Sequence, residues 1–200
     1  MKLWLARHAQ PLIASGICYG VTNVAADEAL TFQAAETLAQ VLPTHTVCRV
    51  SPLLRCQQLA LVLHHIRPDC LMQSTTDEDS HTDPRLAEMN FGYFEGQSWS
   101  EIPKADVDLW MDDFGNHRFG GKESANEVLR RVALALQDSQ TQLAQLAQHR
   151  TQGVDDVLWI THAGVIRAAT LLAQGVTQLE AAEQWPREVP GFGEFMQLVF

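Results

Sequence analysis

Positive charge is scarce in this sequence. Its 200 residues contain 14 lysines and arginines against 24 aspartates and glutamates, which gives a formal net charge of −10, and no run of Lys or Arg occurs. Binding of nucleic acid or of an anionic membrane needs a basic face, so the composition argues against both as partners. A small phosphate ester stays open as a ligand, because a concave site with a few cations can exist on an acidic protein.

Paired cysteines and long hydrophobic runs are missing as well. The four cysteines form no CxxC pair and follow no regular spacing, which disfavours a disulfide framework and a zinc site. No window is long enough for a membrane span, and the apolar start at residues 1–5 is too short for a secretory signal. We therefore expect a cytoplasmic protein. Its length suits a single domain, residues 1–200, with one large core.

What the sequence does contain is a short apolar run, Leu3–Ala6, that stops at Arg7 and His8. Such a run is typical of a buried strand in a parallel sheet, and ligands of open α/β sheets lie beyond the carboxyl ends of the strands. A fixed cation beside an imidazole at that place suggests attack on an anion, most simply a phosphoryl group. An exposed Arg-His pair without a function is the alternative interpretation.

Further apolar runs and amphipathic stretches alternate along the chain, which predicts an α/β fold. The expected strands are 47–50, 70–72, 157–160 and, at an edge, 195–200; the expected helices are 31–42, 53–66, 124–150 and 165–173. Thr31 is the expected N-cap of the first helix, with Leu30 packed on Ala35. Ser124 and Glu127 fit a capping box.

Two segments interrupt this alternation. Residues 75–83 are polar and acidic and are expected to be an exposed connection. Residues 84–122 are rich in Trp, Phe, Gly and acids, and we expect them to be an excursion that folds over the active end of the sheet. Trp99 and Trp110 are expected to pack within this excursion, and stacking on an aromatic leaving group is the other interpretation.

Three separate strand ends carry Arg or His at matching positions. Arg7 and His8 follow the first strand, Arg55 lies in the first helical turn after the second, and His162 follows the strand at 157–160. Helix N-termini at the same edge add backbone N–H groups for an anion. The coincidence favours a phosphoryl-binding site, with a core histidine bonded to backbone as the other interpretation of His162.

Four stretches of the sequence resemble the histidine phosphatase (phosphoglycerate mutase-like) superfamily, in that family's order and spacing. They are Arg7-His8-Ala9, Ser51-Pro52-Leu53-Leu54-Arg55, Leu86 to Gly96, and Thr161 to Arg167. The resemblance implies a three-layer α/β sandwich, in which helices flank a mostly parallel central sheet and residues 84–122 form a short cap insertion within the one domain. The loop at 16–23 looks most like α-ribazole-5′-phosphate phosphatases of cobalamin biosynthesis.

The resemblance also implies a role for each matching residue. His8 would attack phosphorus and carry the phosphoryl group as phosphohistidine, while Arg7, Arg55 and His162 would hold the phosphate oxygens. Glu88 would protonate the leaving oxygen and then help to activate water; a surface carboxylate is the alternative. No metal ion and no other cofactor is expected, since cationic side chains take the place that Mg²⁺ has in other phosphoryl-transfer sites.

The sequence departs from the family pattern at Ala9, at Gln10 and Pro11, and at Ala34, and one further departure concerns a phosphate contact. An Asn that contacts phosphate in many relatives is missing, and Ala14 and Ser15 occupy that region. Ser15, Tyr19 or the amides of their loop are expected to bind substrate instead. Ala163, which follows His162, is also expected to be a substrate-binding residue.

Three functions therefore compete. The first is a metal-independent phosphomonoesterase for a small-molecule phosphate ester, with α-ribazole-5′-phosphate as one candidate. The second is a phosphoglycerate-type mutase, which the short cap disfavours. The third is a non-catalytic phosphate-ligand-binding protein, which the presence of both His8 and Glu88 disfavours. The sequence does not name the substrate, and it leaves a homodimer open.

Overall fold

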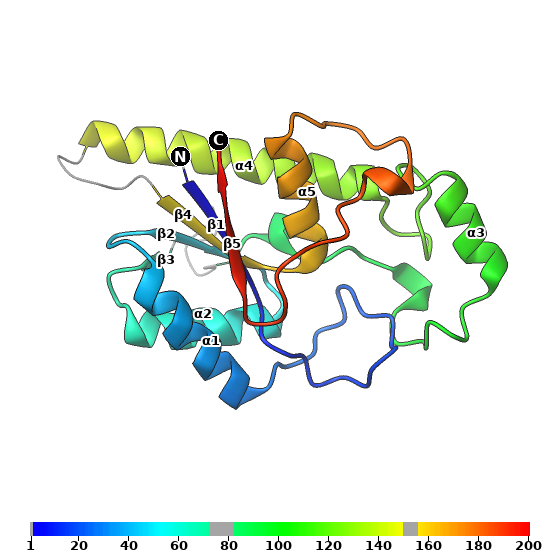
Figure 1. Cartoon of the computed structure of the whole chain (residues 1–200), viewed down its shortest axis with the longest axis horizontal. Coiled ribbons are helices and arrows are strands. Elements are labelled where there is room, and N and C mark those ends of the chain that lie inside the picture. Colours follow the sequence, from blue (N-terminus) through cyan, green and yellow to red (C-terminus); the bar gives the residue numbers. More distant parts are fainter. Residues whose placement is uncertain (1, 73–81, 150–155) are drawn as a thin grey trace.

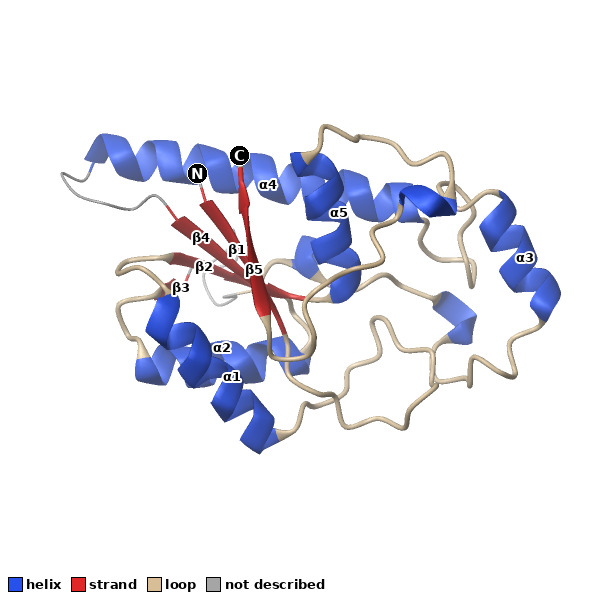
Figure 2. Ribbon diagram, in the orientation of Figure 1, coloured by secondary structure: helices blue, strands red, loops and turns tan. Residues whose placement is uncertain are grey.

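The fold is built on a mixed sheet of five strands in the order β3-β2-β4-β1-β5 (Figure 2). A computed structural model describes residues 2–72, 82–149 and 156–200. The strands are β1 (Lys2–Arg7), β2 (Val47–Val50), β3 (Leu71–Met72), β4 (Asp156–Thr161) and β5 (Phe195–Val199). β1 to β4 run parallel and β5 pairs antiparallel with β1. The expected strands and the C-terminal edge strand are confirmed.

Helices cover both faces of the sheet, which makes the three layers that the sequence predicts (Figure 1). α1 (Glu28–Val41) and α2 (Leu54–Ile66) lie on one face, and α4 (Ala125–His149) and α5 (Ala163–Ala173) lie on the other. No helix in the described ranges is long and apolar enough to cross a membrane.

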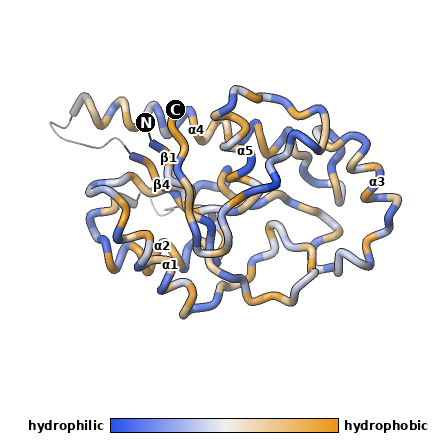
Figure 3. Tube along the Cα trace, viewed as in Figure 1, coloured by the Kyte–Doolittle hydropathy of each residue, from blue (hydrophilic) through white to orange (hydrophobic). Residues whose placement is uncertain are grey.

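The side chains of the central strands alternate between the two faces, as the period of a strand requires. In β1, Leu3 and Leu5 pack into the core under α4 and α5, whereas Trp4 and Ala6 pack into the core under α1 and α2. All six residues of β4 are buried, as expected for a strand covered on both faces. Along α4, hydrophobic and hydrophilic residues alternate in the way that one buried stripe requires (Figure 3).

The first helix starts earlier than the sequence predicted. Asp27, not Thr31, is the N-cap: its carboxylate accepts a hydrogen bond from the Leu30 amide at 2.9 Å, because a short carboxylate reaches the N–H three residues on. Thr31 instead donates its hydroxyl to the Asp27 carbonyl, and Leu30 is 45% exposed in the first turn. The Ser124–Glu127 capping box is confirmed, with both reciprocal bonds formed.

Residues 84–122 form short helical pieces joined by loops; the first piece packs against α4 and β4, whereas the last helix lies away from the sheet (Figure 1). The pieces are η1 (Pro84–Leu86), η2 (Gly92–Phe94) and α3 (Lys104–Asp112). Phe119 stacks on Trp110 at 4.4 Å and on Trp99 at 5.8 Å between ring centroids, so both tryptophans pack within this segment as expected. The expected connection at 75–83 lies largely outside the described residues.

The loop after β1 is tied to this segment. The amide of Cys18 donates to the Gln97 carbonyl, and the amide of Gly96 donates to the Cys18 carbonyl, each at 2.8 Å. These two bonds hold the loop after β1 against the segment at Gly96 and Gln97, which follows β3 in the sequence. The two segments meet at the carboxyl edge of the sheet.

Candidate active site

His8 lies directly after β1, with its ring buried and its tautomer set by its partners. Its Nδ1 lies 2.7 Å from the Ala9 carbonyl oxygen, which can only accept, so Nδ1 carries the hydrogen. Its Nε2 accepts a hydrogen bond from Nε of Arg55 at 3.2 Å. Burial, and next the charge of Arg55, lower the pKa of His8 to about 3. The ring is therefore a neutral imidazole with its lone pair on Nε2, the form that a nucleophile needs.

Arg55 is fully buried in the first turn of α2. Besides Nε2 of His8, its guanidinium reaches the loop after β1: Nη1 donates to the Thr22 carbonyl at 2.9 Å and Nη2 to the Gly20 carbonyl at 2.6 Å. The Arg55 guanidinium also lies 5.4 Å from the centre of the Tyr19 ring. A buried cation is thus fixed beside the histidine by three acceptors.

Arg7 lies on the Phe192 ring, 3.9 Å from its centroid, and donates from Nη1 to the Pro190 carbonyl at 3.0 Å. Its Nε is buried and has no hydrogen-bond partner among the described residues. A buried N–H group without an acceptor is costly, so this Nε is a donor that is available to a ligand.

His162 lies at the N-cap position of α5, with its ring centroid 5.0 Å from that of His8. It is completely buried, and its Nε2 is 2.7 Å from the Ser51 hydroxyl oxygen. Burial, and next the neighbouring His8, hold the pKa of His162 well below its usual value. Ser51 was not assigned a role from the sequence, although it opens the second matching motif directly after β2.

Glu88 lies at the positive end of α5. Its two carboxylate oxygens are each 3.1 Å from the Gly164 amide, and the Met89 amide donates to Oε1 at 2.9 Å. The Glu88 carboxylate lies close enough to raise the pKa values of Arg7, Arg55 and Arg167, each of which burial lowers more strongly. Arg167 is a further cation that the sequence motif contained without an assigned role.

The Glu95 carboxylate holds the loop that carries Tyr19 and the acceptors of Arg55. It accepts hydrogen bonds from the amides of Gly20, Val21 and Thr22 and from the Thr22 hydroxyl. Burial raises the pKa of Glu95, but these hydrogen bonds outweigh burial and the net pKa is lowered. A Cβ atom at Gly20 would lie 1.8 Å from the Met89 carbonyl oxygen, so the tight approach of loop and segment requires glycine there.

The structure thus brings Arg7, His8, Arg55, Glu88 and His162 together at one edge of the sheet. Tyr19 and Ala163 lie beside them, Tyr19 half-buried against Arg55 and Ala163 at the start of α5. Ser15 is exposed on its loop, and no described contact connects it with the other site residues. In residues 2–72, 82–149 and 156–200, no group of three or more His, Cys, Asp or Glu side chains is placed to hold a metal ion.

The family model of the histidine phosphatase superfamily (branch 1) matches residues 3–188. The chain therefore belongs to this superfamily, and it is a phosphatase by class. No curated protein sequence matches it significantly.

Several solved structures share its fold. A mycobacterial glucosyl-3-phosphoglycerate phosphatase is 20% identical with a TM-score of 0.71, and the match covers 98% of this chain and 88% of that one. An α-ribazole phosphatase from Shigella flexneri is 20% identical with a TM-score of 0.71, covering 98% and 89%. The TTHB049 protein of Thermus thermophilus is 23% identical with a TM-score of 0.61, covering 98% and 92%.

Proposed function

We propose that the protein hydrolyses a small-molecule phosphomonoester in two steps through a phosphohistidine on His8, without a metal ion. The observation that carries the proposal is the setting of that ring: a neutral imidazole with its lone pair on Nε2, a fixed guanidinium beside it, and a buried Arg7 Nε that lacks an acceptor among the described residues. Cations placed in this way bind phosphate oxygens and stabilise the charge that develops on them.

In the first step, Nε2 of His8 forms a bond to phosphorus as the ester P–O bond breaks. The phosphate oxygens take over the Arg55 hydrogen bond that Nε2 accepts in the free protein, which releases the lone pair for attack. The Glu88 carboxyl group gives its proton to the leaving alkoxide. Its Oε2, which accepts from Gly164 alone, is the oxygen that is freer to carry this proton.

In the second step, water attacks the phosphorus of the phosphohistidine and the P–N bond breaks. The Glu88 carboxylate takes the proton from the water, so that Glu88 returns to its starting state and inorganic phosphate leaves. His162 and the two arginines hold the phosphoryl oxygens in both steps. No redox change occurs, and the only co-reactant is water.

Replacing Glu88 with glutamine tests the proton transfer. Glutamine keeps the size of the side chain but has no proton to give, so an alkyl phosphate, whose alkoxide must be protonated, is expected to lose turnover on the order of 100-fold or more. p-Nitrophenyl phosphate is expected to lose less than about 5-fold, because p-nitrophenolate leaves without a proton. The measurement is inorganic phosphate release from both esters, and equal losses on both would contradict the acid role of Glu88.

Replacing Gly164 with alanine tests the placement of the same carboxyl group. A Cβ at Gly164 would lie 2.2 Å from Oε1 of Glu88, so the flexible carboxylate must move away from the helix terminus. We expect turnover of the alkyl phosphate to fall about 10- to 100-fold. The melting temperature is expected to change little or rise, because alanine favours a helix over glycine by about 1 kcal/mol. Unchanged turnover would show that this position of Glu88 is not needed.

α-Ribazole-5′-phosphate is our candidate for the substrate. The loop at 16–23 supports it, as does the fold shared with the α-ribazole phosphatase of Shigella flexneri; the glucosyl-3-phosphoglycerate phosphatase is as similar in fold and identity. The deciding experiment is to compare kcat/KM for both esters within one panel of phosphomonoesters. A preference for the ribazole ester of at least about tenfold would support a place in cobalamin biosynthesis.

The same panel separates the phosphatase from the mutase, since a mutase would isomerise a phosphoglycerate without net phosphate release. No feature of the described site favours the mutase or a non-catalytic binder over hydrolysis. The cytoplasmic location and the homodimer stay predictions, to be measured by cell fractionation and by light scattering.

A further inference from the structure

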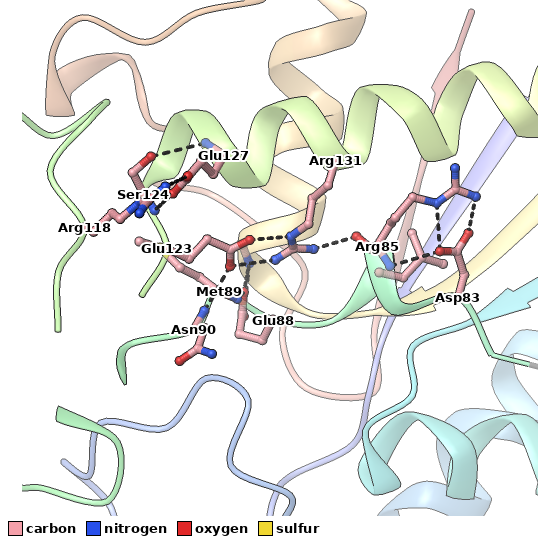
Figure 4. Close-up of polar contacts among 12 residues, drawn as sticks. Asp83, Arg85, Glu88, Met89, Asn90, Arg118, Glu123, Ser124, Glu127 and Arg131 are labelled. Atoms are coloured by element: carbon pink, nitrogen blue, oxygen red, sulfur yellow. Dashed lines mark hydrogen bonds and ion pairs between the residues drawn. The ribbon is translucent and has the colours of Figure 1, made fainter. Parts of the chain in front are cut away.

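Glu88 lies in a segment that has no regular structure of its own. It follows η1, which ends at Leu86, and precedes η2, which begins at Gly92. Neither a helix nor a strand therefore sets the position of its backbone. The segment is instead attached through side chains that come from elsewhere in the chain (Figure 4).

Two of these side chains form a bidentate ion pair next to Glu88. Nε of Arg131, on α4, donates to Oε1 of Glu123 at 2.7 Å, and its Nη2 donates to Oε2 at 3.2 Å. Each side chain is only 18% exposed, so water screens the pair less than it screens a surface ion pair. A fork of this kind also fixes the direction of both groups.

The pair contacts the backbone on both sides of Glu88. Arg131 donates from Nη1 to the carbonyl of Arg85, three residues before Glu88, at 2.5 Å. Glu123 accepts from the amide of Asn90, two residues after Glu88, at 3.0 Å. Figure 4 shows Arg131 between Arg85 and Glu123, with Glu88 in the span that these contacts enclose.

We propose that Arg131 and Glu123 are a positioning pair for Glu88: they hold both ends of its segment so that its carboxyl group stays over the amide of Gly164. The proposal rests on the acid role proposed for Glu88. Neither residue touches substrate. They act by keeping the proton donor within reach of the leaving oxygen, where a misplacement of about 1 Å can cost on the order of 100-fold in rate.

Replacing Arg131 with methionine tests this role. Methionine keeps the apolar stem but removes the hydrogen bond to the Arg85 carbonyl and the ion pair with Glu123. Glu88 is therefore expected to lose its position. Turnover of the alkyl phosphate is expected to fall about 10- to 50-fold, while p-nitrophenyl phosphate loses less than about 3-fold. A merely structural defect would lower both rates together. In a Glu88→Gln background, Arg131→Met is expected to add no further selective loss, because both changes remove the same proton transfer.

The matched control is Arg67→Met. Arg67 is 19% exposed, forks onto the Asp69 carboxylate and donates to the Ala39 carbonyl, so it makes the same kinds of contact as Arg131. It caps the far end of α2, about 18 Å along that helix from Arg55 at 1.5 Å per residue. We expect Arg67→Met to change the turnover of the two esters by the same factor. A second variant, Glu123→Gln, leaves Arg131 and its contact to Arg85 in place and is expected to show a smaller selective loss on the alkyl ester.

Two failures can be told apart. If Glu88→Gln lowers both esters equally, the acid role is wrong and the positioning proposal falls with it. If Glu88→Gln is selective for the alkyl ester but Arg131→Met behaves like Arg67→Met, the positioning proposal alone is overturned. Hydrogen exchange supplies a readout without substrate: the Asn90 amide is expected to exchange at least about tenfold faster in Arg131→Met and at the wild-type rate in Arg67→Met, and unchanged exchange in Arg131→Met would also overturn the proposal.

Discussion

Replacing His8 with alanine is expected to abolish phosphate release, with a loss of turnover on the order of 10⁴-fold or more. The variant lacks the imidazole ring, which the Ala9 carbonyl and Arg55 hold in place and whose Nε2 is the nucleophile. The fold is expected to survive, although Arg55 loses an acceptor at a cost of about 1–3 kcal/mol. Rates are measured by phosphate release, and unfolding by circular dichroism.

Detection of the covalent phosphohistidine tests this prediction most directly. With a radiolabelled ester, wild-type protein quenched within one turnover should carry label that acid releases and alkali does not, as expected of a phosphoramidate. His8→Ala should carry none. His64→Ala is the control, because His64 is an exposed histidine on α2, and it should label like the wild type. Hydrolysis by His8→Ala at the wild-type rate would refute a phosphohistidine.

Acid is expected to destabilise the fold steeply, well before the carboxylates titrate. Burial and Arg55 lower the pKa of His8 to about 3, and burial and His8 hold the pKa of His162 well below its usual value. Both rings are therefore neutral in the folded state. In the unfolded chain they bind protons as the pH falls below about 6.5.

The sign follows from proton linkage. Below about pH 6.5 the unfolded state binds more protons than the folded state, so stability that is present above this pH is lost as the pH falls towards the folded pKa values. Each histidine contributes a slope of about 1.4 kcal/mol per pH unit, or about 2.7 kcal/mol for the two together. Urea unfolding between about pH 6.3 and about pH 5 measures the slope, because few carboxylates bind protons in that window.

The variants assign this slope to its source. His8→Ala removes one of the two histidines that bind a proton on unfolding, so about half of the slope is expected to disappear. His64→Ala, at an exposed position on α2, is the control for the loss of a histidine as such. A wild-type stability that stays flat across this window would mean that the two buried rings are not neutral in the folded protein.

Most of the fold could be predicted from the sequence because its signals are local. The apolar runs at β1, β2 and β4 and the periodic helices mark their own elements, and a parallel arrangement then brings the carboxyl ends of the strands to one edge. That is why Arg7, His8, Arg55 and His162 could be grouped without a structure. The start of α1 was missed because Asp27 and Thr31 are both good N-caps, and the choice between them depends on how the loop after β1 enters the helix.

The sequence alone determined the α/β class and the family, since each rests on residue types at fixed spacings. Only the tertiary structure decided which acceptors hold Arg55, that Ser51 contacts His162, and that Glu95 holds the Tyr19 loop. These contacts join residues tens of positions apart, and their geometry comes from how the loops pack across the sheet edge. No periodicity in the sequence encodes such packing.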